Sequence, residues 1–150
     1  NFISNSGAMN RVSLSNETDN ITSVDVTTLD AELTADTKYF LKIDVEGYEY
    51  NVIEGASALL ASDNVLAIII ELNGSGRKFG NSDQKVHEKL LGFDFIPISY
   101  SPASREIERL VGYNQNSFGN TIYVKNVLMM TERCKAAPKR MIHTAAGLTI

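Results

Sequence analysis

Apolar residues follow two periods along this chain, one typical of strands and one typical of helices. Strand-forming residues fill positions 39–45, and the run stops at Gly47. Beyond that glycine, apolar positions recur every three or four residues, which predicts a helix over residues 48–60. A second run, residues 65–72, holds six consecutive apolar residues. Such a segment cannot have a solvent-exposed face, so it predicts a strand covered on both sides, as in parallel sheets.

The N-terminal segment has a weaker pattern. Residues 1–20 contain few apolar positions, so we expect a loop or a ragged edge hairpin. Residues 21–28 are β-branched and partly alternating, which predicts a strand at a sheet edge. Thr28 or Asp30 can cap a short helix before the strand of residues 39–45.

The C-terminal half predicts one more helix and two more strands. Ser82 or Asp83 can cap the helix, and Gly92 is suited to its C-terminal end. No good helix precedes the last strand, so that strand can pair antiparallel with its neighbour. The strands are expected at residues 93–98 and 121–124, with a long polar loop and a helical turn between them at 99–119.

This order of elements favours a single α/β domain. Strand, helix, strand, helix, strand is a doubly wound pattern with right-handed crossovers. The predicted fold is a partial doubly wound sheet, mostly parallel with an antiparallel last strand. At 150 residues the chain has the length of one domain. Residues 131–150, with several lysines and arginines, are left as a tail of uncertain structure.

Composition narrows the classes of partner and compartment. The formal net charge of -4, without a basic stripe, argues against a nucleic-acid partner. The longest apolar run, residues 65–70, is too short to cross a bilayer, so no membrane partner is expected. Cys134 is the lone cysteine and cannot form an internal disulfide, so we expect a cytoplasmic protein.

Four short motifs together resemble the C-terminal half of the FkbM-type methyltransferases. The most specific is the string from Lys42 to Gly47 followed by a glycine-alanine pair. The resemblance implies a Rossmann-like class I methyltransferase fold over residues 1–130, S-adenosylmethionine as the methyl donor, and O-methylation. The four motifs are Thr27-Thr28-Leu29-Asp30, Leu41-Lys42-Ile43-Asp44-Val45-Glu46-Gly47, Val52-Ile53-Glu54-Gly55-Ala56 and Ile70-Glu71-Leu72.

The chain differs from that family in the motifs that bind the methyl donor. In such enzymes the donor lies mainly on a glycine-rich turn after the first strand and on an acid ending the second. Neither motif precedes residue 24, and no Gly-x-Gly turn joins a strand to a helix. We therefore expect only the C-terminal half of a methyltransferase, with most of the donor site missing and no cofactor-binding residue assigned.

Acidic residues end the strand of residues 39–45. Asp44 and Glu46 stand two residues apart, so an extended backbone directs both carboxylates to one face. The resemblance places them on the acceptor side, where one carboxylate accepts the proton of a substrate hydroxyl. Burial of Asp44 would raise its pKa and favour this role. Alternatively, Glu46 caps the next helix or pairs with Lys42.

Glu71 and Asn73 end the neighbouring strand. If the two strands are adjacent and parallel, Asp44, Glu71 and Asn73 converge at one sheet edge. Oxygen ligands of this kind suit Mg²⁺ or Ca²⁺. We favour the metal-free alternative, in which Glu71 hydrogen-bonds the substrate or the loop. The candidate catalytic residues are Asp44, Glu46, Glu71 and Asn73.

Other polar residues carry weaker hypotheses. His87 follows an apolar helix position and is expected at the surface. Arg105 and Arg109 first predict a solvated helical turn, with contacts to an anionic or glycan substrate as the alternative. Three tyrosines either line a sugar-binding cleft or pack in the core: Tyr48, Tyr100 and Tyr113.

Two functions remain open from the sequence. The first is a methyltransferase fragment that acts on a hydroxyl of a small molecule or glycan. The second is a non-catalytic α/β module that forms a homodimer through its open sheet edge. Binding of S-adenosylhomocysteine separates them, because a donor site raises the melting temperature when it is filled.

Overall fold

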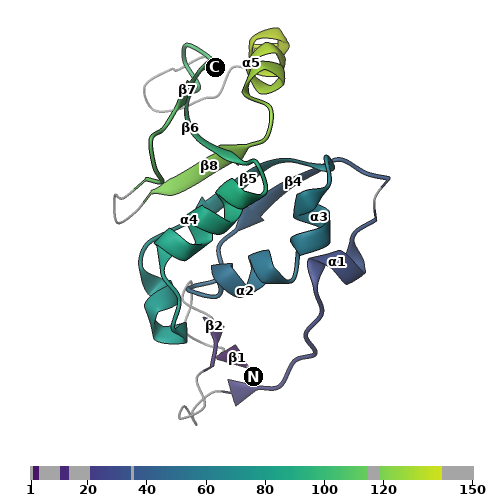
Figure 1. Ribbon diagram of the computed structural model, residues 1–150, viewed down its shortest axis with the longest axis vertical. Coiled ribbons are helices and arrows are strands. Elements are labelled where there is room, and N and C mark those ends of the chain that lie inside the picture. The colour runs from purple at the N-terminus through teal and green to yellow at the C-terminus, as the bar shows by residue number, and fades with distance from the viewer. Residues whose placement is uncertain (1, 4–10, 14–20, 35, 115–118, 140–150) are drawn as a thin grey trace.

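The computed structural model describes residues 2–3, 11–13, 21–34, 36–114 and 119–139 (Figure 1). Two sheets are present in these ranges. The strands of the larger sheet are β4 (Tyr39–Ile43), β5 (Val65–Glu71), β6 (Ile96–Ser101), β7 (Glu106–Arg109) and β8 (Asn120–Val124). The helices are α1 (Leu29–Glu32), α2 (Glu49–Glu54), α3 (Ser57–Ala61), the 3₁₀ helix η2 (Ser75–Phe79), α4 (Asp83–Gly92) and α5 (Val127–Ala136).

The larger sheet is mixed, with strand order β4-β5-β8-β6-β7. β4 and β5 are parallel, whereas β8 pairs antiparallel with both β5 and β6. β7 then pairs antiparallel with β6 at the far edge. The α/β class and the antiparallel last strand are confirmed. The expected mostly parallel pairing is replaced by a mixed sheet, because β8 separates β5 from β6 and β7 adds a hairpin.

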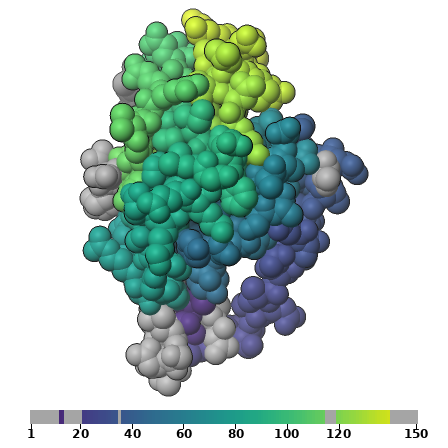
Figure 2. All heavy atoms as spheres, viewed as in Figure 1, coloured from purple at the N-terminus to yellow at the C-terminus, as the bar shows by residue number. Residues whose placement is uncertain are grey.

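Helices cover the two faces of this sheet unequally. Alternate residues of β5 explain why: Ile68 and Ile70 join the larger core, whereas Ala67 joins a smaller one on the other face. The larger core lies under α2, α3 and α4, and Figure 2 shows α4 over the middle of this side. The smaller core includes Val127 and Met130 of α5. β5 is therefore covered on both sides, as its apolar run predicts.

The predicted helix of residues 48–60 is broken into α2 and α3 at Gly55. The Asp30 carboxylate explains the second start, because it accepts hydrogen bonds from the amides of Ala58 and Leu59 at 2.9 and 2.8 Å. The first amides of a helix have no partner within it, so a side-chain oxygen that accepts their hydrogen bonds stabilises the start of the helix. Thr28 caps α1, as predicted. Ser82 caps α4, as predicted.

Several boundaries differ from the sequence expectation. The edge strand expected at 21–28 shortens to β3 (Ile21–Thr22), which pairs with β1 (Phe2–Ile3) beside β2 (Arg11–Val12) in a small antiparallel sheet. Most of the expected loop or hairpin at 1–20 lies outside the described residues. The strand expected at 93–98 starts later, at Ile96.

The long loop expected at 99–119 contains a strand instead of a helical turn. β7 forms a hairpin with β6, and Arg105 sits in the connecting turn with φ 60°. The Arg105 guanidinium donates hydrogen bonds to the carbonyls of Lys135 and Ala137. The hairpin thereby holds the end of α5, which runs across the predicted boundary between residues 130 and 131. Among the described helices, none has the length and apolarity needed to cross a bilayer.

Candidate active site

The carboxyl ends of β4 and β5 lie side by side. The parallel register pairs Ile43 with Ile70, so Asp44 and Glu71 follow at neighbouring positions. One carboxylate oxygen from each of Asp44, Glu46 and Glu71 lies within 4.8 Å of the others. The predicted convergence of Asp44 and Glu71 is therefore confirmed. We call these three residues the acidic cluster.

A tight left-handed turn directs Glu46 into the acidic cluster. Glu46 has φ 54° and Gly47 has φ 104°. This conformation is costly for a residue with a side chain, so neighbouring groups must hold it. The buried Glu49 does so, because its Oε1 accepts hydrogen bonds from the amides of Val45 and Gly47 at 3.3 and 3.1 Å. Glu49 thus bonds to amides that precede α2, and it holds the turn that carries Glu46.

Sequence reasoning missed Glu49, although a signal was present. Glu49 is the first residue of α2, and acids are favoured in the first turn of a helix, where amides lack partners. Its carboxylate reaches backwards across the turn instead of into solvent. Two amides that flank Glu46 are thereby satisfied inside the protein.

The loop after β5 packs directly on the turn after β4. A Cβ atom at Gly47 would lie 2.6 Å from the Ser75 carbonyl oxygen and 2.9 Å from Lys78 Cε. The Tyr48 and Phe79 rings also meet edge to face, with centroids 5.3 Å apart. Glycine at position 47 therefore allows an approach that a side chain would block. The two loops support the acidic cluster as one unit.

The three carboxylates have different electrostatic environments. Lys42 Nζ donates a hydrogen bond of 2.9 Å to Asp44 Oδ2, and this contact holds the pKa of Asp44 below its ordinary value. Burial, followed by the hydrogen bond and the charge of Asp44 and by the charge of Glu46, raises the pKa of Glu71. Partial burial of Asp44 acts in the opposite direction but is outweighed by Lys42, so the raised pKa expected for Asp44 is wrong. Within the pair, Glu71 is the stronger base.

The Asn73 side chain forms a hydrogen bond within its own loop. Its side-chain oxygen accepts a hydrogen bond of 2.9 Å from the Ser75 amide, which closes a turn. The amide of Gly74, which lies between Asn73 and Ser75, donates to Asp83 Oδ2 at 2.9 Å. Asn73 therefore shapes the loop after β5.

The acidic cluster has the donor type that hard cations prefer, three carboxylates. Lys42 already neutralises Asp44, and acids on a surface commonly cluster without an ion. We assign no metal to these residues.

His87 is a correction to the sequence expectation. It is buried, not at the surface, and its Nδ1 lies 2.8 Å from the Tyr123 hydroxyl. Burial lowers the pKa of His87 and raises that of Tyr123. The His87 ring also packs against Tyr113, with centroids 5.4 Å apart. The position of His87 beside an apolar residue predicts exposure, but α4 turns the side chain toward Tyr123 of the sheet.

A comparison with known protein families gives one match. The model of the methyltransferase FkbM domain matches residues 1–97, a range that includes the whole acidic cluster and Glu49. No curated protein and no solved structure matches the chain.

Proposed function

Because this chain belongs to the FkbM methyltransferase domain family, we propose that it forms part of an S-adenosylmethionine-dependent O-methyltransferase. The acceptor in this proposal is a hydroxyl group of a small molecule or glycan. The observation that carries the proposal is the convergence of Asp44, Glu46 and Glu71 at the carboxyl ends of two adjacent parallel strands. Ligands of open α/β sheets bind at such strand ends.

In this proposal Glu71 is the general base. The acceptor O–H donates its proton to the Glu71 carboxylate, and burial raises the pKa of that carboxyl toward the working pH. Asp44, held ionised by Lys42, accepts a hydrogen bond from the acceptor and orients it. This assigns to Glu71 the proton transfer that the sequence alone suggested for Asp44. A bound S-adenosylmethionine supplies the electrophilic methyl group.

The two turns beside the acidic cluster have no free amide for the donor at Gly47 or at Gly74. A donor cradle needs backbone amides that point at the ligand. The Gly47 amide is already bonded to Glu49, and the Gly74 amide is already bonded to Asp83. We therefore place the donor contacts away from these two amides, and we derive no step through the donor. The antiparallel β8 supports the class I methyltransferase fold that the sequence resembles.

The direct test is a titration of S-adenosylhomocysteine, followed by the melting temperature. A filled donor site stabilises the folded protein in proportion to the logarithm of ligand concentration. We expect a rise in the wild type and the same rise in Glu71→Gln, because Glu71 faces the acceptor. A melting temperature that stays constant up to millimolar ligand would refute a usable donor site in this chain or its assemblies.

One observation favours the second candidate, a self-associating module. β4 is an edge strand of the larger sheet, with β5 as its strand partner in the described ranges, and Phe40 on it is 59% exposed. Open edges of this kind pair with other chains. Light scattering tests it: Phe40→Lys should convert a dimer into a monomer, whereas Leu128→Lys, at another exposed apolar residue, should not.

A cytoplasmic location completes the proposal. The lone Cys134 is unpaired and half-buried on α5, so nothing in the described fold depends on an oxidising compartment. Fractionation of cells that express the protein checks this location.

A further inference from the structure

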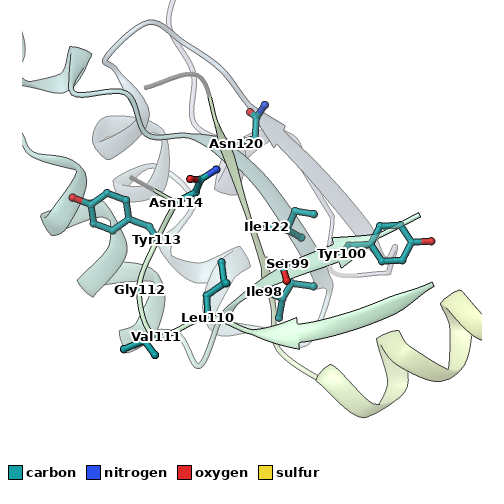
Figure 3. Close-up of a pocket in the computed structure, with 10 residues that line it drawn as sticks. All are labelled: Ile98, Ser99, Tyr100, Leu110, Val111, Gly112, Tyr113, Asn114, Asn120 and Ile122. Carbon is teal, nitrogen blue, oxygen red and sulfur yellow. The ribbon is translucent and has the colours of Figure 1, made fainter. Parts of the chain in front are cut away.

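A cleft opens where β6 and β8 separate. The two strands pair from Ile96 with Val124 as far as Ile98 with Ile122, and pairing ends there. Beyond that point the segment after β7 borders the gap, and the cleft has a volume of about 610 Å³ (Figure 3). This volume is in the range of small-molecule sites. Its lining residues are Ile98, Ser99, Tyr100, Leu110, Val111, Gly112, Tyr113, Asn114, Asn120 and Ile122.

The lining of this cleft combines apolar and amide groups and contains no charged side chain. In Figure 3, Leu110 and Asn114 lie on one side of β8 and the Ile122 side chain projects from the other, while the rings of Tyr100 and Tyr113 extend to either side. Amide groups can donate and accept hydrogen bonds at once, which suits neighbouring hydroxyls. Isoleucine and leucine side chains suit the C–H faces of a ring. The chemistry of the lining therefore fits an uncharged, polyhydroxylated molecule.

The cleft adjoins the acidic cluster through one strand pair. Asn120 of β8, which lines the cleft, lies directly opposite Glu71 of β5 in the antiparallel register. Side chains at directly opposed positions share a face of the sheet, with Cβ atoms about 5 Å apart. A molecule in the cleft therefore has the proposed base beside one of its walls.

We propose that this cleft binds the acceptor and that the acceptor is a neutral sugar. One hydroxyl reaches Glu71, while others bond to Asn120 and to Ser99. A negatively charged sugar is disfavoured, because three carboxylates lie next to the cleft and its lining offers no cation. The methyl transfer rests on the proposed function, but sugar binding in the cleft does not.

Saturation-transfer NMR tests the binding with the methyl glycosides of glucose, galactose, mannose and rhamnose, without donor. We expect at least one glycoside to bind the wild type at tens of millimolar. Asn120→Ala should weaken that binding about three- to tenfold, as the loss of one to two hydrogen bonds predicts. Ser99→Ala should weaken it less. Asn51→Ala is the matched control, because Asn51 is exposed on α2 and does not line the cleft.

Three outcomes overturn the sugar site. They are no binding of any glycoside, equal binding to wild type and Asn120→Ala, and tighter binding of glucuronate than of methyl glucoside. The donor titration is an independent readout. Loss of glycoside binding in Asn120→Ala, with no response to S-adenosylhomocysteine, would keep the sugar site and reject a usable donor site in this chain or its assemblies. A response to S-adenosylhomocysteine without glycoside binding would reject the sugar site alone.

Discussion

The acidic cluster and the cleft lie at the same end of the strands of one sheet, but they are built in opposite ways. The cluster is charged and lies at the ends of two adjacent parallel strands, where the Glu49 hydrogen bonds and the close contact at Gly47 hold the loops in place. The cleft is neutral and lies where the first residues of β8, which runs between β5 and β6, are not paired with β6. Chemistry is thus fixed by local turns, whereas the space beside it depends on sheet topology. Variants in the two regions should therefore have separable effects.

The largest expected effect comes from the proposed base. Glu71→Gln keeps the size of the side chain but removes proton acceptance, so we expect turnover with a neutral glycoside acceptor to fall about 10²- to 10⁴-fold. Glycoside binding in the cleft should change little. Glu106→Gln is the control, because Glu106 is exposed on β7. Turnover at the wild-type rate in Glu71→Gln would remove Glu71 from the mechanism and leave Asp44 as the candidate base.

The next largest effect concerns the contact between the two loops. Gly47→Ala places a Cβ 2.6 Å from the Ser75 carbonyl oxygen at φ 104°, so the loops must separate. We expect the free energy of unfolding to fall by about 3 kcal/mol. Chemical denaturation measures it.

Gly92→Ala provides the matched control for that variant. Gly92 ends α4 and has nothing within 4 Å of its added Cβ. The higher helix propensity of alanine should leave the protein equally stable or slightly more stable. Equal losses at both glycines would show that close packing at Gly47 is not the cause.

This contrast also explains which features the sequence could predict. Periodicity and turn residues located β4, β5 and α4, and parallel neighbours then implied that Asp44 meets Glu71. The β6–β7 hairpin was missed because its four-residue strand, Glu106–Arg109, alternates charges with a single apolar residue. Burial of His87 was missed because its partner, Tyr123, is 36 residues away. The cleft depends on where two strands stop pairing, which no local pattern encodes.

A smaller effect on stability is expected at Glu49, which holds the turn in the acidic cluster. Glu49→Ala leaves the amides of Val45 and Gly47 without their acceptor, which should cost about 2 kcal/mol of stability. Glu49→Gln retains an acceptor oxygen and should recover most of that loss. Because Glu49 positions the Glu46 turn and touches no substrate, glycoside binding in the cleft should be unchanged in both variants. A loss of glycoside binding would show that the acidic cluster and the cleft are not independent.

The smallest expected effect is electrostatic. Lys42→Met removes the ammonium that lowers the pKa of Asp44 and, to a lesser degree, that of Glu71. Both pKa values should rise, so the acid limb of the pH–turnover profile should move to higher pH, and carboxyl ¹³C NMR should report the same direction. A lowered Asp44 pKa contributes stability above the pKa of the unfolded chain and loses it as pH falls through the folded value. The variant should therefore be less stable than wild type at neutral pH, by less than about 1 kcal/mol because the pair is half exposed, and equal to it in strong acid. A limb that moves to lower pH, or stays in place, would show that Lys42 does not set the protonation of the acidic cluster.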